Sequence, residues 1–132
     1  VDSIVIPMKN HNNGFLELVQ KALENIPEYD VHQVKNKIDN SDTFSLVDVR
    51  EDREWVQGSI LPSIHIGKGV IERDVANLIP DQNMEIVLYC QGGYRSALAG
   101  EALKAMGYSN VFSMSGGFSD WLNNNFPIQK NN

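Results

Sequence analysis

Cys90 is the only cysteine in the chain, and it stands where an apolar run meets two glycines and a helix-like segment. The stretch reads EIVLYCQGGYRSALAGEAL, residues 85–103. A lone thiol permits three roles: an inert buried side chain, a reactive nucleophile, or one half of an intermolecular disulfide. It excludes an internal disulfide framework and any zinc or iron–sulfur site built from several cysteines of this chain.

The residues after Cys90 favour a negative charge on its sulfur. Gly92 and Gly93 permit a tight turn in which successive backbone N–H groups point at one spot. A helix that starts near Arg95 adds its unpaired N–H groups and the positive end of its dipole, while Ser96 adds a hydroxyl. We therefore expect Cys90 to be a thiolate at neutral pH. The same loop would also stabilise a persulfide, R–S–S⁻, after the cysteine has taken up a sulfur atom.

Other chemistries find little support in the sequence. The P-loop pattern G-x-x-x-x-G-K-[ST] does not occur, so a phosphate cradle of that kind is excluded. His11, His32 and His65 lack the spacing of metal ligands, and we interpret them as surface or loop side chains. We expect no metal and no cofactor.

Composition limits the molecule to one ordinary domain. The chain has 132 residues, of which 42% are hydrophobic and 21% charged. A net charge of −6 and the lack of a long basic run argue against nucleic acid and anionic membranes as partners. No apolar stretch approaches the roughly 20 residues that span a bilayer. A free cysteine favours the cytoplasm, but the chain starts at Val1 and not at methionine, so a removed export signal stays an open alternative.

The elements that would position Cys90 follow from the hydrophobic pattern. Apolar runs predict strands at 44–50, 63–66, 86–90 and 110–114. Helical spacing predicts helices at 15–26, 31–38, 51–57, 69–79, 95–107 and 118–125, with Gly107 as a C-terminal cap. Alternating strands and helices predict an α/β fold with a central, mainly parallel sheet and helices on both faces. Cys90 would lie beyond the carboxyl end of a strand, where such sheets bind their ligands.

Three motifs, in this order, resemble the rhodanese family of sulfurtransferases. LVDVREDREWVQGSI is similar to that family's strand with an Asp and an Arg, followed by Glu and Gly before Ile. CQGGYRSALAGEALKAMGY is similar to its C-x-x-G-x-R-S loop and the next helix, and VFSMSGGFSDWL to its closing strand, double-glycine turn and Trp-bearing helix. The resemblance implies an N-terminal extension with an amphipathic helix (1–29), a single rhodanese-like domain (30–128) and a C-terminal tail (129–132).

The resemblance also implies roles for individual residues. Cys90 would be the catalytic nucleophile that carries sulfur. The cradle around it would consist of six residues: Gln91, Gly92, Gly93, Tyr94, Arg95 and Ser96. Asp48 and Arg50 would support this loop, and a purely structural ion pair between them is the favoured alternative to a direct role in catalysis. The resemblance further implies structural positions: Glu54 as the partner of an arginine, Gly116 and Gly117 as a turn, and Trp121 as a core anchor.

The implied activity is transfer of sulfane sulfur through a persulfide on Cys90. The donor would be thiosulfate, a polysulfide or a persulfide, and the acceptor cyanide, a thiol or a protein, with the chain acting as a monomer or a homodimer. The alternative is a sulfur-carrier or regulatory binding module with little turnover of small molecules. A cysteine phosphatase is disfavoured, because such enzymes place five residues between Cys and Arg whereas CQGGYR has four.

Two further features qualify the resemblance. In GSILPS, residues 58–63, Ser59 stands where the family often has histidine and the proline falls one position later, so we expect this turn to differ from the family's usual one. Around the loop, Arg95 is the one cation in the motif, while Lys68 and Arg73 either come near or stay solvated. A dianion such as thiosulfate would be steered weakly, so a persulfide is the expected better donor.

Overall fold

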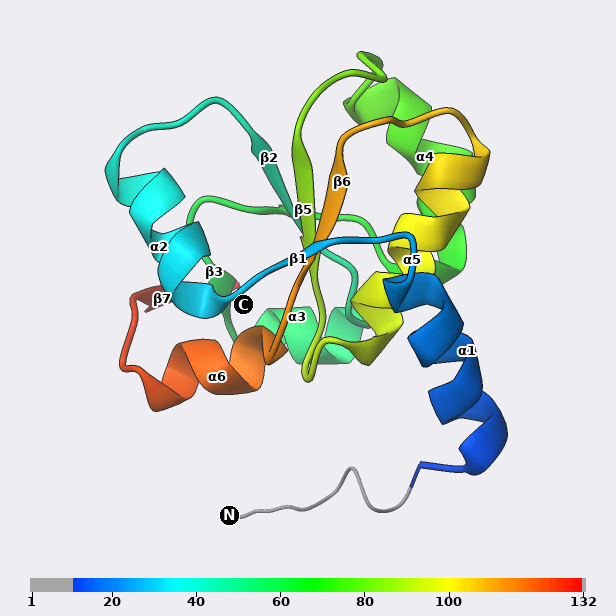
Figure 1. Ribbon diagram of the computed structural model, residues 1–132. Coiled ribbons are helices and arrows are strands. Elements are labelled where there is room, and N and C mark those ends of the chain that lie inside the picture. The colour runs from blue at the N-terminus through cyan, green and yellow to red at the C-terminus, as the bar shows by residue number, and fades with distance from the viewer. Residues whose placement is uncertain (1–10, 132) are drawn as a thin grey trace.

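Four strands expected from the apolar runs form the body of a five-stranded sheet in the computed structural model, which describes residues 11–131 (Figure 1). The sheet order is β1-β6-β5-β2-β4, and every neighbouring pair is parallel. The strands are β1 (Glu28–Tyr29), β2 (Ser45–Asp48), β4 (Ile64–His65), β5 (Ile86–Tyr89) and β6 (Val111–Met114). The predicted α/β fold with a mainly parallel sheet is confirmed. Expectations for residues 1–10 and 132 lie outside the described residues.

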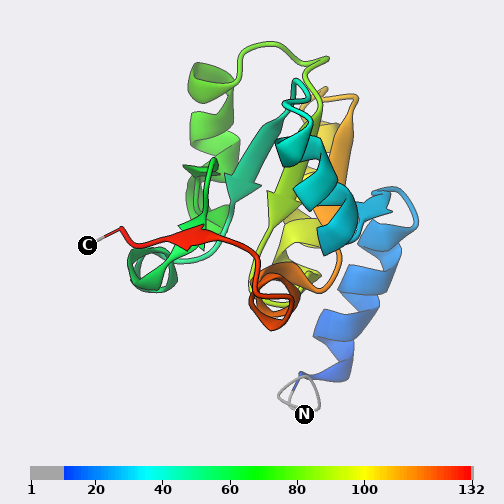
Figure 2. The same cartoon turned by 90° about the vertical axis from the view of Figure 1, so that its left-hand side faces the viewer.

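Helices cover both faces of this sheet (Figures 1 and 2). One face packs on α4 and α5, and the other on α2 and α6. Helix α1 lies outside α5, and α3 follows β2. The helices are α1 (Asn13–Leu23), α2 (Val31–Asp39), α3 (Asp52–Gln57), α4 (Ile71–Leu78, preceded by a 3-10 turn at Lys68–Val70), α5 (Tyr94–Ala105) and α6 (Gly117–Asn123).

Strand β5 shows how the sequence builds the two-sided core. Successive side chains of a strand point to opposite faces, so a strand between two helical layers needs apolar residues at every position. Leu88 and Cys90 belong to the cluster with α4 and α5, whereas Val87 and Tyr89 belong to the cluster with α2 and α6. All four are at most 1% exposed.

Local signals set the helix ends. An Asp30–Gln33 capping box starts α2. Gly107, predicted as a cap, has a φ of +107° just beyond α5. Its N–H donates to the Lys104 carbonyl, and the Tyr108 N–H donates to the Leu103 carbonyl, which is the Schellman arrangement.

Three two-residue strands have no counterpart in the sequence prediction, because two residues are too few to show a period. They are β1, β3 (Ser59–Ile60) and β7 (Ile128–Gln129). Strands β3 and β7 pair antiparallel as a separate small sheet. Helix α1 also ends at Leu23, earlier than the predicted residue 26.

Among residues 11–131, no helix combines the length and the hydropathy needed to cross a membrane.

Candidate active site

Cys90 lies directly beyond the last residue of β5, at the carboxyl edge of the sheet, and is 1% exposed. The chain turns through residues 91–93 and enters α5 at Tyr94. Gly93 makes this turn with a φ of +98°, a region that favours glycine. A Cβ atom there would also lie 3.2 Å from the Gly116 nitrogen. Gly92 has no such positive φ, so only the second glycine is required by the backbone.

Three hydrogen-bonding groups surround the sulfur. The N–H groups of Gly93 and Ser96 donate to Sγ at 3.1 and 3.3 Å. The Ser96 hydroxyl lies 3.5 Å from Sγ. A thiol can donate to that hydroxyl and a thiolate can accept from it, so the same contact serves both forms. The remaining loop residues, Gln91, Gly92, Tyr94 and Arg95, line the cleft above the sulfur.

A second hydroxyl extends this contact into the sheet. Ser113 of β6 is fully buried, and its Oγ lies 2.7 Å from Ser96 Oγ. The VFSM run predicts only a strand, and Ser113 was not expected at the site. A polar side chain among apolar residues of a strand is the signal that could have found it, because a hydroxyl that becomes buried needs a partner.

The start of α6 holds the backbone of the cysteine loop. The Phe118 N–H donates to the Cys90 carbonyl at 2.9 Å, and the Ser119 N–H donates to the Gln91 carbonyl at 3.0 Å. Gly117 has a φ of +58°, and a Cβ atom there would lie 2.5 and 2.6 Å from these two carbonyl oxygens. The double-glycine turn expected from the sequence therefore also touches the loop that carries the sulfur.

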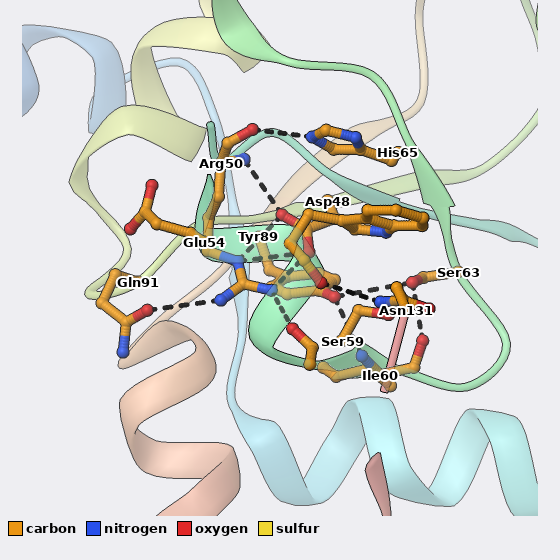
Figure 3. Close-up of polar contacts among 12 residues, drawn as sticks. Asp48, Arg50, Glu54, Ser59, Ile60, Ser63, His65, Tyr89, Gln91 and Asn131 are labelled. Atoms are coloured by element: carbon orange, nitrogen blue, oxygen red, sulfur yellow. Dashed lines mark hydrogen bonds and ion pairs between the residues drawn. The ribbon is translucent and has the colours of Figure 1, made fainter. Parts of the chain in front are cut away.

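Asp48 and Arg50 form a buried ion pair beside the loop (Figure 3). Arg50 Nη2 lies 2.7 Å from Asp48 Oδ2 and donates to the Gly58 carbonyl at 2.6 Å. Its Nη1 donates to Gln91 Oε1 at 3.4 Å. Burial acts to lower the pKa of Arg50, but the hydrogen bond and charge of Asp48 outweigh it and raise that pKa. The Asp48–Arg50 ion pair thus contacts the cysteine loop through the Gln91 side chain and not through the sulfur of Cys90.

Arg95 is also paired. Its guanidinium donates to both Glu54 carboxylate oxygens, at 2.8 and 3.0 Å. This hydrogen bond lowers the pKa of Glu54 and raises that of Arg95. Glu54 on α3 therefore pairs with an arginine, as expected, and its partner is Arg95 of the cysteine loop. The positive charge that the sequence placed beside Cys90 is largely compensated.

A cleft of about 900 Å³ opens above Cys90. Besides the loop, α1, β1, α3 and α6 contribute to its walls. Lys68 and Arg73 are not among its lining residues, and Arg73 pairs with Asp74 on an exposed surface. The lining outside residues 90–95 consists of His11, Phe15, Leu23, Glu28, Glu54, Ser115, Gly116, Ser119, Asp120 and Asn123.

Within residues 11–131, no group of three or more His, Cys, Asp or Glu side chains is arranged to hold a metal ion. His65, which the sequence left as a surface or loop residue, is partly buried. Its Nε2 lies 2.8 Å from the Arg50 carbonyl and its ring stacks on Trp55. The role is therefore local packing around Arg50.

At the turn that contains Ser59, the serine side chain makes hydrogen bonds to the C-terminal segment. Ser59 is fully buried in β3, and its hydroxyl accepts from the side chains of Gln129 and Asn131 at 3.3 and 2.8 Å. Asn131 also donates to the Trp55 carbonyl at 2.8 Å. Serine at this position thus ties the end of the described chain to the segment that supports Arg50.

Comparisons with known proteins bear on the family and the fold of this chain. A model of the rhodanese-like domain matches residues 30–124. YrkF of Bacillus subtilis, named as a proposed sulfur carrier protein, is 32% identical over 96 residues, which are 73% of this chain and 51% of YrkF. This chain thus spans about half the length of YrkF. YtwF of the same bacterium, named as a proposed sulfurtransferase, is 33% identical over 96 residues, which are 73% of this chain and 90% of YtwF.

A solved structure shares the fold over nearly the whole chain. RPA3614 of Rhodopseudomonas palustris, described as a protein of unknown function and possible tyrosine phosphatase, superposes with a TM-score of 0.80 at 24% identity. The superposition covers 98% of this chain and 100% of RPA3614. At that identity the likeness concerns the fold alone.

Proposed function

The chain belongs to the rhodanese-like domain family, and from this premise we propose that it is a sulfurtransferase in which Cys90 carries the transferred sulfur. The donor is a sulfane-sulfur compound, and the acceptor is a thiophilic molecule. Gln91 to Ser96 form the substrate-binding loop, and Asp48 and Arg50 support it. Relatives named as sulfur carrier and sulfurtransferase support this class of chemistry.

The reaction runs in two balanced steps. In the first, the Cys90 thiolate attacks the outer sulfur of the donor, a new S–S bond forms, and the donor's own bond to that sulfur breaks. The leaving group departs with the electron pair, as sulfite from thiosulfate or as a thiolate from a persulfide. In the second step the acceptor attacks the outer sulfur of the Cys90 persulfide and releases the thiolate. Such a covalent intermediate predicts ping-pong kinetics.

One observation carries this proposal: the N–H groups of Gly93 and Ser96 converge on Sγ at 3.1 and 3.3 Å. Backbone donors fixed in a buried site stabilise an anion there at little reorganisation cost. An inert core cysteine has no use for two donors aimed at its sulfur. Four residues between Cys90 and Arg95 also suit one sulfur atom better than a phosphoryl group, so a phosphatase is not proposed.

A sulfur carrier is the second candidate, and burial of the sulfur favours it. Cys90 is 1% exposed and lines the cleft, so a persulfide stored on it is shielded from bulk solvent. Carrier and enzyme share the first step. They differ in how fast a free acceptor such as cyanide discharges the persulfide.

Intact mass spectrometry tests both candidates. After incubation with a persulfide donor, the protein should gain the mass of one sulfur atom, and cyanide should remove it. Cys90→Ser should never gain that mass. Rapid discharge by cyanide supports the enzyme, slow discharge supports the carrier, and no added mass with thiosulfate, polysulfide or persulfide contradicts both.

A further inference from the structure

Helix α1 forms one wall of the cleft above Cys90, although it precedes the segment that matches the family domain, residues 30–124. It packs on α5 through Val19 and Ala22, which meet Ala97, and all three side chains are buried. Gly100 of α5 allows close approach, because a Cβ atom there would lie 3.1 Å from Ile26. The wall is therefore held against the helix that begins in the cysteine loop.

The inner surface of this wall is aromatic. The rings of His11, Phe15 and Tyr94 contact one another, with centroids 4.9 to 6.1 Å apart, and all three residues line the cleft. Tyr94 belongs to the cysteine loop, while Phe15 comes from α1, so the cluster joins the loop to the extension. The half-buried rings of Phe15 and Tyr94 and the exposed ring of His11 face the cleft and offer apolar contact area that an inorganic sulfur anion cannot use.

The charges in the cleft also favour an organic ligand over an inorganic anion. Among the described lining residues are the carboxylates of Glu28, Glu54 and Asp120 and one guanidinium, that of Arg95. Glu54 already pairs with Arg95. A dianion such as thiosulfate thus meets more negative than positive charge, whereas an uncharged or cationic organic molecule meets no such barrier.

We propose that the aromatic wall formed by His11, Phe15 and Tyr94 is a subsite for the carbon part of a low-molecular-weight organic thiol, which accepts the sulfur of the Cys90 persulfide. The inference rests on the proposed function and names its acceptor class. The thiol binds uncharged and loses its proton to solvent, and the resulting thiolate attacks the outer sulfur and forms an S–S bond in R–S–S⁻. The bond to Sγ breaks, and Cys90 leaves with the electron pair as a thiolate.

The test compares an aromatic acceptor with an inorganic one on the full chain. The protein is first loaded with a persulfide donor, and loading is checked by intact mass. The second-order rate of discharge is then measured with phenylmethanethiol and with cyanide. Phe15→Ala should lower the rate with phenylmethanethiol about tenfold, the scale of one aromatic contact, and leave the rate with cyanide unchanged.

Two further variants separate binding from folding. Leu18→Ala changes the same helix at a side chain that is 56% exposed and outside the cleft lining, so neither rate should change. Phe15→Leu keeps an apolar side chain for packing and should give a smaller decrease with phenylmethanethiol at unchanged melting temperature. Equal slowing with both acceptors in Phe15→Ala, or no slowing with either, overturns the subsite. A wild-type protein that never gains sulfur overturns the proposed function itself, and the mass check reveals this before any acceptor is added.

Discussion

The hydroxyl groups of Ser96 and Ser113 form a short chain that leads from the Cys90 sulfur into the sheet. With a thiol, the Cys90 S–H donates to Ser96, whose hydroxyl is then free to donate to Ser113. With a thiolate or persulfide, both donations reverse, and Ser113 supports the Ser96 hydroxyl as it points to the sulfur. The pair therefore adapts to each charge state without moving a backbone atom.

Ser113→Ala should make Cys90 less reactive. Without its 2.7 Å partner, the Ser96 hydroxyl is less firmly held as a donor to the anionic sulfur. One neutral hydrogen bond is worth about 1 kcal/mol, so we expect the rate of alkylation by iodoacetamide at neutral pH to fall roughly threefold to tenfold. Ser109→Ala, an exposed serine before β6, is the control and should have no effect. Equal alkylation rates in wild type and Ser113→Ala would contradict the proposed hydroxyl chain.

Glu54→Gln should improve the use of thiosulfate. The substitution removes the carboxylate that neutralises Arg95. It keeps an acceptor for the Glu51 N–H, because glutamine also closes a capping box. Freeing one positive charge a few ångströms from a bound dianion is worth on the order of 1 kcal/mol, so kcat/KM for thiosulfate should rise about fivefold.

The control for Glu54→Gln is an uncharged acceptor. Its rate of discharge should not change, since the substitution acts through charge alone. If thiosulfate turnover falls instead, the Glu54–Arg95 pair serves to hold the loop in shape, and the charge argument fails.

At the scale of elements, the N-terminus of α6 fixes the position of the cysteine loop. Gly117→Ala should displace that loop, because its Cβ atom would lie 2.5 Å from the Gln91 carbonyl oxygen in a backbone conformation that favours glycine. We expect a loss of about 1–3 kcal/mol in the free energy of unfolding and a large decrease in the rate of persulfide loading. Gly69→Ala is the matched control, since a Cβ atom there meets nothing within 4 Å. A folded Gly117→Ala protein with normal loading would argue against this role.

The longer helices and strands could be predicted because each shows a hydrophobic periodicity or a run of apolar residues. The strand at 86–90 is apolar at every position because both its faces are buried, and Gly107 marks the end of α5. Two-residue strands such as β1 and β7 depend on a partner strand far away in the sequence, so no local pattern reveals them. The same distinction holds for the candidate site. Cys90 and its loop form one contiguous motif and could therefore be predicted from the sequence.

The contacts that complete the site come from distant segments. Ser113 meets Ser96 only after β6 has paired with β5, and Phe15 reaches the cleft only after α1 has docked on α5. Glu54 was expected to meet an arginine, but which arginine depended on how α3 lies against the loop. The sequence therefore predicts Cys90 and its loop as the candidate site, but not most of the residues that surround them.

At the scale of the molecule, the net charge of −6 acts on every charged substrate before it reaches the cleft. Raising the salt concentration from about 10 mM to 150 mM shortens the Debye length from about 30 to 8 Å and should increase kcat/KM for thiosulfate about twofold to threefold. Discharge by uncharged 2-mercaptoethanol should stay constant at a fixed pH. A thiosulfate rate that falls as salt increases would mean that the donor is attracted, and the charge argument would be wrong.

The single, buried sulfur atom at the base of the cleft also decides how long a loaded protein lasts. With no second cysteine in the chain, a persulfide on Cys90 cannot close into an internal disulfide or trisulfide and expel its sulfur. At 1% exposure, two Cys90 residues cannot bring their Cα atoms within the 4.4–6.8 Å that a bridge between copies requires without opening the loop. Discharge of a Cys90 persulfide would then depend on an acceptor that enters the cleft, and the loaded state would last until one does.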